Sequence, residues 1–161
     1  MIDFLDFKIQ KKFMSKALAQ ARLAYKSDEV PIGAVVANKN GEVIGRGYNQ
    51  MEKRGCQIYH AEVQAIKKAC KKIGDWRLND CWIFVTLEPC LMCLGIIKLS
   101  RISGLIFGSE SPLFGFRKEL DKNLNISYQD LIIKEGVKNK QSGDLLKKFF
   151  KKARSKADHL E

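Results

Sequence analysis

Two short stretches that lie far apart in the chain constrain its fold most strongly, because their residue types suit one shared site. The first is His60-Ala61-Glu62, and the second is Pro89-Cys90-Leu91-Met92-Cys93. Together they carry an imidazole, a carboxylate and two thiols. Zinc takes histidine nitrogen and cysteine sulfur as ligands. A fold that suits this chain must therefore bring the two stretches together around one ion.

The second stretch predicts a helix start with both thiols on one face. Cys90 and Cys93 are three residues apart, and side chains at that spacing are neighbours on a helix. Pro89 suits the first turn, where no amide hydrogen is missed. A helix N-terminus also lowers the pKa of a thiol and favours the thiolate that zinc needs. His60 is likewise expected at a helix start.

Three protein ligands leave the fourth tetrahedral position for water, as in catalytic zinc sites. Zinc lowers the pKa of such a water to about 7. Glu62 lies two positions after His60, off the helical face of the ligand, where it can reach the water without binding the ion. A carboxylate there can act as general base and then as general acid. The pattern favours hydrolytic deamination, in which hydroxide adds to a ring carbon and ammonia leaves.

Other interpretations of these residues have less support. A redox-active CxxC motif does not account for His60 and Glu62. A structural zinc site needs a fourth ligand, and Cys70 lies roughly 15 Å along the helix from His60. Cys81 falls at the far end of its strand. Spacing alone does not exclude Cys56, in a loop before His60, as a fourth zinc ligand. A closed Cys3His site is therefore the second hypothesis.

The composition is typical of one globular domain. The chain has 161 residues, of which 45% are hydrophobic and 3 are proline, so it can bury a core. No window approaches the ~18 consecutive apolar residues of a membrane span, and no signal peptide is visible. Five cysteines, an odd number, favour metal binding or free thiols in a reducing compartment. We expect a single domain over residues 1–161, no membrane partner and a cytoplasmic location.

Positive charge gathers near the C-terminal end. The net charge is +11, which favours a polyanionic partner, whereas the plainer explanation is lysine on every solvated face. The distribution of charge along the chain favours a polyanionic partner, because residues 134–156 contain nine Lys or Arg residues and only two acidic residues, Glu135 and Asp144. A basic C-terminal helix therefore predicts nucleic-acid binding.

The apolar pattern predicts an α/β fold. Asn40-Gly41 between two β-branched runs is typical of an antiparallel hairpin, and the helix-strand alternation after it implies crossovers and parallel pairing onto that hairpin. We expect a three-layer α/β/α domain around a mixed sheet of about five strands. Residues 49–59 are expected to be a loop and residues 108–130 to be irregular. The elements are expected at 8–27 (helix), 32–37 and 42–48 (strands), 60–73 (helix), 81–87 (strand), 90–99 (a helix apolar almost all round, hence buried), 102–107 and 131–137 (strands) and 145–153 (helix).

Several stretches, in order and spacing, resemble bacterial tRNA-adenosine deaminases. The HxE and PCxxC motifs are specific for the zinc deaminase superfamily, whereas the VTLEPC run and the basic Phe-Phe helix point to the tRNA branch. The similarity covers nearly the whole chain. The stretches are 29–35, Gly47-Tyr48-Asn49, His60-Ala61-Glu62, 85–90, Ser100-Arg101-Ile102, Phe107-Gly108 and 142–150.

The resemblance implies a cytidine-deaminase-like fold, a homodimer, and conversion of the wobble adenosine of a tRNA anticodon to inosine. It assigns one Zn²⁺ to His60, Cys90 and Cys93, and the proton shuttle to Glu62. It implies further that the base and the anticodon loop are bound by five positions. These are Asn49 (hydrogen bond to the flipped base), Ala61 (backbone amide), Ile32 (pocket lining), and Phe149 and Phe150 (anticodon loop), although core packing is the simpler role for at least one of the two phenylalanines.

Two segments depart from the family pattern, 56–59 and 109–116, and the resemblance places both beside the substrate.

Two other functions are possible for these motifs. The first is a free-base deaminase acting on guanine or cytosine, because residues 60–93, including Lys68-Ala69-Cys70, also resemble guanine deaminases. The basic C-terminal helix argues against this function, since a small neutral base needs no phosphate-binding surface. A catalytically silent, zinc-stabilised RNA-binding subunit is the other, and the intact Glu62 argues against that.

Overall fold

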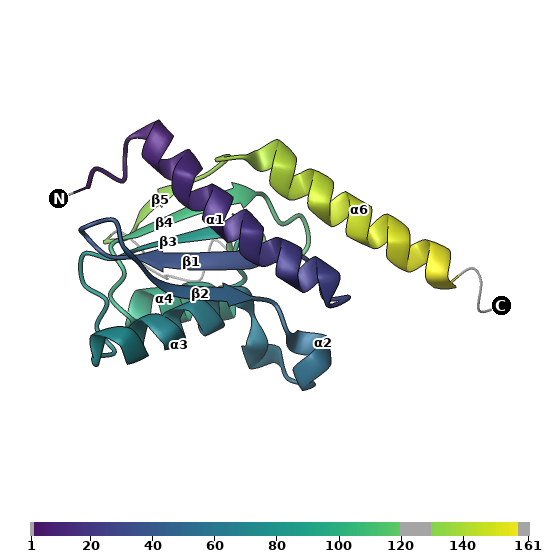
Figure 1. Cartoon of the computed structure of the whole chain (residues 1–161), viewed down its shortest axis with the longest axis horizontal. Helices are drawn as coiled ribbons and strands as arrows, with labels where there is room; N and C mark the ends of the chain where they lie inside the picture. Colours follow the sequence, from purple (N-terminus) through teal and green to yellow (C-terminus); the bar gives the residue numbers. More distant parts are fainter. Residues whose placement is uncertain (1, 120–129, 158–161) are drawn as a thin grey trace.

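A mixed sheet of five strands, in the order β2-β1-β3-β4-β5, forms the middle layer of the protein (Figure 1). The structure is a computed structural model that describes residues 2–119 and 130–157. The predicted α/β class and strand number are confirmed. The strands are β1 (Gly33–Ala37), β2 (Val43–Tyr48), β3 (Trp82–Leu87), β4 (Gly104–Ser109) and β5 (Ile132–Lys134).

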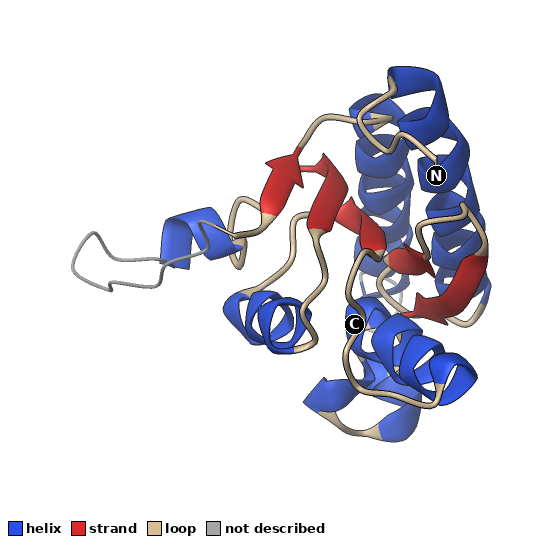
Figure 2. Cartoon of the chain, turned by 90° about the vertical axis from the view of Figure 1, so that its left-hand side faces the viewer, coloured by secondary structure: helices blue, strands red, loops and turns tan. Residues whose placement is uncertain are grey.

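Helices cover both faces of the sheet, as Figures 1 and 2 show. The long helices α1 and α6 lie on one face, and α3 and α4 lie on the other. The arrangement confirms the predicted three layers. The helices are α1 (Phe7–Lys26), α2 (Met51–Arg54), the 3-10 turn η1 (Gln57–Tyr59), α3 (Ala61–Ile73), α4 (Leu91–Leu99), α5 (Phe116–Glu119) and α6 (Asn139–Ala157).

The pairing of β3 corrects one prediction. The hairpin of β1 and β2 is antiparallel as expected, but β3 pairs with β1 antiparallel, not parallel. The reason is the path of α3, which carries the chain from β2 across β1 to its far side, so that β3 runs in the direction of β2. Beyond this point the expectation holds, since β3 with β4 and β4 with β5 are parallel pairs.

Successive residues of a strand point to opposite faces of the sheet, and their side chains pack in two hydrophobic cores, one on each face. Ile83 and Val85 of β3 pack toward α3 and α4, in a cluster with Ala65 and Leu94. Phe84, between them in the chain, packs in the other cluster with α1 residues that include Phe13 and Met14. The helical spacing in 8–27 is confirmed, because Phe13, Ala17, Ala21 and Ala24 are all buried in α1.

Two glycines let α3 lie unusually close to β2. A Cβ atom on Gly47 would come within 2.1 Å of the carbonyl oxygen of Ala61, and one on Gly45 within 2.0 Å of the carbonyl oxygen of Ala65. Any side chain at these positions would push the helix away from the strand. The spacing of the two glycines therefore fixes the start of α3, and with it the position of Glu62.

Several local predictions differ from the structure, among them the last strand, which is shorter than 131–137, and the last helix, which is longer than 145–153. The predicted loop 49–59 contains α2 and η1, and the strand expected at 102–107 begins two residues later as β4. The helix expected to be buried, α4, exposes Leu99 by 77% and Met92 by 36%. The irregular stretch 108–130 includes α5, and its residues 120–129 lie outside the described residues. In the described part of the chain, no helix has the length and apolar character to cross a membrane.

Candidate metal and substrate site

The candidate metal ligands and substrate-binding residues predicted from the sequence lie at one edge of the sheet. Strands β2 and β3 both end at this edge, because they run in the same direction, and α3 and α4 begin just beyond it. Helix α3 has His60 as its N-cap and α4 has Cys90 as its N-cap. The fold thus brings together two helix starts that are remote in sequence, which is a common location for polar sites in open α/β sheets.

His60, Cys90 and Cys93 form a compact cluster. The Nδ1 atom of His60 lies 3.5 Å from the Sγ of Cys93 and 3.8 Å from the Sγ of Cys90. The three candidate ligand atoms all lie within 4.8 Å of one another. Cys93 is buried, while His60 and Cys90 are half-buried. One imidazole and two thiols at this spacing form a donor set that suits zinc.

The thiols of the cluster differ in acidity. The hydrogen bond with Cys93, aided by one with His60, lowers the pKa of Cys90 to about 4 against the effect of burial. The same hydrogen bond and burial raise the pKa of Cys93. The lowered pKa of Cys90 favours its thiolate, which is the form that binds a metal ion.

Glu62 lies in the first turn of α3 and is 4% exposed. Burial raises the pKa of its carboxyl group, while the nearby imidazole of His60 acts in the opposite direction. A buried carboxyl beside a candidate metal site, with a pKa moved toward neutrality, suits a group that both accepts and donates a proton.

Cys56 lies outside this cluster. Its side chain is exposed in the turn between α2 and η1. Among the described residues, the group of potential ligands at the site consists of His60, Cys90 and Cys93. The geometry favours three protein ligands and an open fourth position over a closed Cys3His site.

Ile32 and Asn49 lie side by side at the same edge of the sheet. The backbone N–H of Asn49 donates to the carbonyl of Ile32 at 3.1 Å. Asn49 is 3% exposed and Ile32 is half-buried against the core. Ala61, at the start of α3, is fully buried. These three predicted substrate positions are thus grouped around the N-terminus of α3.

Glu29 is a residue whose role the sequence did not reveal. Its carboxylate is 1% exposed and accepts hydrogen bonds from the backbone N–H groups of Glu52 (3.1 Å) and Lys53 (2.7 Å). It also accepts from Nδ2 of Asn49 at 3.5 Å. Glu29 therefore caps α2 from a distance and turns the carbonyl oxygen of the Asn49 carboxamide away from itself. The chain separation hides this capping from local patterns.

Replacing Glu29 with glutamine is expected to lower the free energy of unfolding by about 1–3 kcal/mol, because a buried amide then loses its acceptor. The same change loosens Asn49, so the KM for substrate rises. Denaturant unfolding and steady-state kinetics measure the two effects. Glu42→Gln serves as the control, since Glu42 is exposed and its carboxylate accepts from Asn38; we expect a change within about 0.5 kcal/mol. Equal effects in both variants would contradict the role of Glu29.

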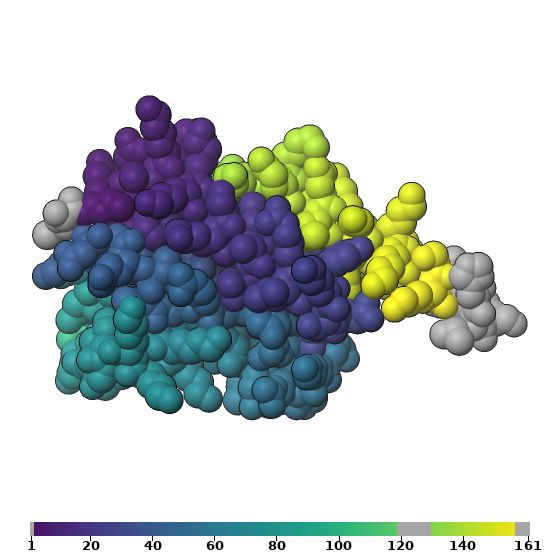
Figure 3. Space-filling model, viewed as in Figure 1, coloured from purple at the N-terminus to yellow at the C-terminus, as the bar shows by residue number. Residues whose placement is uncertain are grey.

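The basic helix α6 is docked beside this edge. Phe149 is half-buried and packs edge-on against Tyr25, with ring centroids 6.3 Å apart, whereas Phe150 is 45% exposed. Lys152 forms an ion pair with Asp28 at 2.7 Å, one residue before Glu29. Phe149 thus takes the predicted packing role, and Phe150 faces solvent. The far end of α6 projects from the body of the protein (Figure 3).

Comparison with known proteins gives concordant matches. A model of the MafB19-like deaminase family matches residues 9–154. A tRNA-specific adenosine deaminase of Streptococcus pyogenes serotype M3 is 38% identical over 159 residues, 94% of this chain and 91% of the relative. A structure from work on tRNA:A34 deaminases superposes with a TM-score of 0.74 at 34% identity, covering 84% of this chain and 99% of that one. A guanine deaminase of Bacillus subtilis gives a TM-score of 0.61 at 32% identity, covering 73% and 82%.

The fold, the histidine-cysteine cluster and the family model together define the class of this protein as a deaminase. The extent of the similarity narrows the class, because 38% identity extends over nearly the full length of both chains. The chain belongs to the tRNA-specific adenosine deaminases, as the resemblance in its sequence predicts. The named tRNA-specific adenosine deaminase matches at 38% identity over 94% of this chain, against 32% identity over 73% for the guanine deaminase, so the free-base alternative is not favoured.

Proposed function

We propose that this chain is a zinc-dependent hydrolytic deaminase that converts the wobble adenosine of a tRNA anticodon to inosine. The observation that carries the proposal is the convergence of His60, Cys90 and Cys93 within 4.8 Å, with the buried carboxyl of Glu62 in the adjoining helix turn. A redox or purely structural role leaves Glu62 without a purpose. The names of the similar proteins support the substrate.

The chain's own residues fit the reaction. His60, Cys90 and Cys93 would hold the ion; when bound, zinc lowers the pKa of a water molecule and so supplies hydroxide. Glu62 takes the proton of the attacking water and passes it to a ring nitrogen of the base. The nucleophile adds to C6 of adenine; the bond from C6 to the amino nitrogen then breaks, and the amino group takes the second proton of the water through Glu62 and leaves as ammonia. The base itself is extruded from the anticodon loop, where unstacking costs little.

The substrate pocket follows from the same geometry. Asn49 binds the extruded base through its carboxamide, whose orientation Glu29 sets. The backbone amide of Ala61 offers a further donor, and Ile32 lines the apolar wall. The pocket positions the base for attack at a carbon atom, because ring and nucleophile must be aligned before the chemistry can proceed.

Helix α6 supplies the surface for the anticodon arm. Phe150 faces the loop, Phe149 supports this surface from its half-buried position against Tyr25, and lysines face the phosphates. Exposed lysines are its main feature, and Lys152 already neutralises Asp28. RNA readers combine splayed bases, stacking and phosphate contacts. A free nucleobase needs none of this basic surface.

Replacing Lys147 and Lys151 of α6 with glutamine is expected to weaken tRNA binding and to reduce its salt dependence. Each phosphate contact contributes about 0.7 to the slope of log K against log[salt] on single strands, so we expect a slope smaller by about 1.4. Binding titrations at several salt concentrations measure it. Lys67→Gln with Lys71→Gln removes the same charge from the exposed face of α3. An equal loss of slope in this control would mean that net charge, not α6, binds the RNA.

We also propose a single domain over residues 1–161, a homodimer and a cytoplasmic location. The exposed apolar side chains of α4, Leu99 and Met92, support the dimer, because they are seven residues apart and so share one helix face, and exposed apolar surface is where protein–protein contacts form. Light scattering should give twice the chain mass. A monomeric mass at micromolar concentration would contradict the dimer.

One assay separates the proposed function from free-base deamination. The zinc-loaded protein is incubated in parallel with a tRNA whose anticodon is ACG and with guanine, and ammonia release is measured in both. We expect ammonia from the tRNA and none from guanine. Release from guanine alone would replace this proposal with a guanine deaminase.

A further inference from the structure

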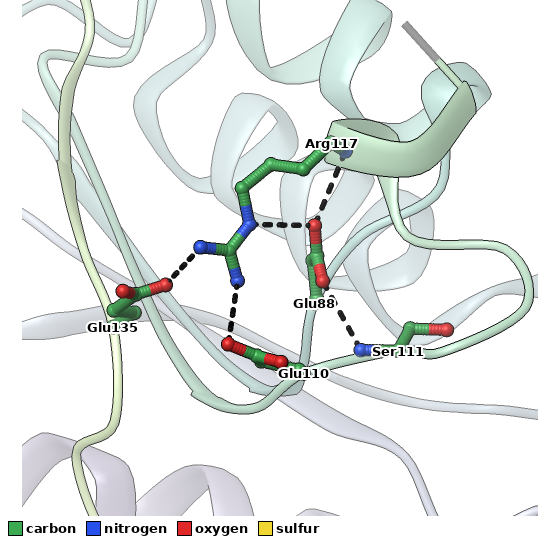
Figure 4. Close-up of polar contacts among 5 residues, drawn as sticks. All are labelled: Glu88, Glu110, Ser111, Arg117 and Glu135. Carbon is green, nitrogen blue, oxygen red and sulfur yellow. Dashed lines mark hydrogen bonds and ion pairs between the residues drawn. The ribbon is translucent and has the colours of Figure 1, made fainter.

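The segment 111–117 is fastened to the turn that leads into Cys90. Glu88 lies two residues before Cys90 and is 5% exposed. Its carboxylate accepts hydrogen bonds from the backbone N–H of Ser111 at 3.1 Å and from that of Arg117 at 3.2 Å. Both ends of the segment are therefore held by one buried carboxylate, as Figure 4 shows.

Two further contacts bring the segment against the same turn. The backbone N–H of Phe116 donates to the carbonyl of Pro89 at 2.9 Å. A Cβ atom on Gly115 would lie 2.5 Å from the carboxylate of Glu88, so only glycine permits this approach. The peptide that directly precedes Cys90 is thus part of the support of the segment.

Arg117 joins this support to two other parts of the site edge. Its Nε atom lies 3.0 Å from Glu88, one terminal nitrogen lies 3.5 Å from Glu110, and the other pairs with Glu135. Its guanidinium group also lies over the ring of Phe107, 5.1 Å from the centroid. Figure 4 shows the three carboxylates converging on one side chain. We call these four charged residues, 88, 110, 117 and 135, the Arg117 cluster.

Only arginine can serve three carboxylates in this way. Its planar fork presents five donors in fixed directions, whereas lysine offers a single point charge. Without Arg117, three carboxylates would face one another, and like charges at this spacing repel. Glu135 follows β5 and precedes α6, so the same side chain also ties the start of the basic helix to the turn before Cys90.

The middle of the segment, residues 112–114, is exposed to solvent. Leu113 is 74% exposed and Phe114 is 65% exposed, while Ser111, Gly115 and Phe116 are buried. A short loop of this kind keeps a defined position only if its ends are fixed. Because the ends are fixed on the residues next to Cys90, the position of the loop is set relative to the candidate metal site.

We propose that Arg117 is a positioning residue for tRNA binding, because it holds the 111–117 segment at the rim of the substrate pocket. The inference rests on the proposed function. It assigns part of the affinity for tRNA to the Arg117 cluster, which contacts neither the target base nor the metal ion. Because the segment is held on Glu88 and Pro89, next to Cys90, we expect nucleotides beside the target adenosine to pass close to it.

Arg117→Ala tests this role with two measurements. The KM for an anticodon stem-loop is expected to rise about tenfold while kcat stays within about twofold, the pattern of a lost binding contribution. Amide hydrogen exchange at Ser111 and Arg117 is expected to accelerate without substrate, because their shared support is weakened. Arg117→Lys keeps the charge and is expected to give an intermediate KM; a merely stabilising role would give the wild-type KM.

Arg77→Ala is the matched control. Arg77 is exposed, pairs with Asp75 at 3.2 Å, and lies before β3 at the opposite edge of the sheet. An unchanged KM in Arg117→Ala, or an equal rise in Arg77→Ala, would overturn the proposal. Should the wild-type protein form no inosine, the proposed function fails, and the exchange rates of the 111–117 amides still decide whether Arg117 holds the segment.

Discussion

Replacing Glu62 with glutamine is expected to lower kcat for tRNA deamination by about 10²–10⁴-fold while zinc content and tRNA affinity stay at wild-type values. The change keeps the shape of the side chain and removes its ability to take and return a proton, and general acid–base catalysis typically contributes 10²–10⁴-fold. Single-turnover kinetics at saturating tRNA, together with metal analysis, measure the effect.

Glu52→Gln is the control for this variant, because Glu52 is an exposed carboxylate in the neighbouring α2. It is expected to retain the wild-type kcat. Glu62→Gln with near-normal turnover would mean that another group moves the proton. Loss of folding in Glu62→Gln would instead mean that the carboxylate is structural, and would revive the hypothesis of a catalytically silent subunit.

Replacing Cys93 with serine is expected to reduce zinc content from about one ion per chain to near zero and to abolish activity, because an alcohol is a poor replacement for a thiolate ligand. Cys93 is fully buried at the centre of the cluster, 3.5 Å from His60. Metal analysis after gel filtration and the inosine yield measure the two effects.

Cys56→Ser makes the opposite change in the same experiment. Cys56 is exposed and lies outside the cluster, so zinc content and activity are expected to stay at wild-type values. Zinc loss in Cys56→Ser would rule out the three-ligand site and support the closed Cys3His site. Normal zinc content in Cys93→Ser would show that the ion is held elsewhere.

Much of the architecture could be predicted because it depends on residue types and spacings within single helices, strands and turns. Asn40-Gly41 identifies the hairpin, the apolar spacing in 8–27 identifies α1, and the spacing of Cys90 and Cys93 places both thiols at one helix start. The convergence of His60 with the two thiols follows from residue types alone, since one ion needs all three.

Other features depend on contacts between distant segments, which no local pattern contains. The antiparallel pairing of β3 with β1 depends on which side of the hairpin the crossover reaches. Helix α2 lacks a side-chain cap of its own and is capped by Glu29, more than twenty residues earlier. Arg117 gathers carboxylates from three separate segments. Helix α4 looks like a core helix by composition, yet Leu99 is exposed in the single chain.

The central claim is tested most directly by locating inosine in the product. The zinc-loaded protein is incubated with a tRNA whose anticodon begins with adenosine, and the product is digested and analysed for inosine and its position. The same tRNA with guanosine at the wobble position is the control. We predict one inosine per tRNA, at the wobble position, and none in the control. Absence of inosine from the adenosine-bearing tRNA, with zinc bound and Glu62 intact, would contradict the account.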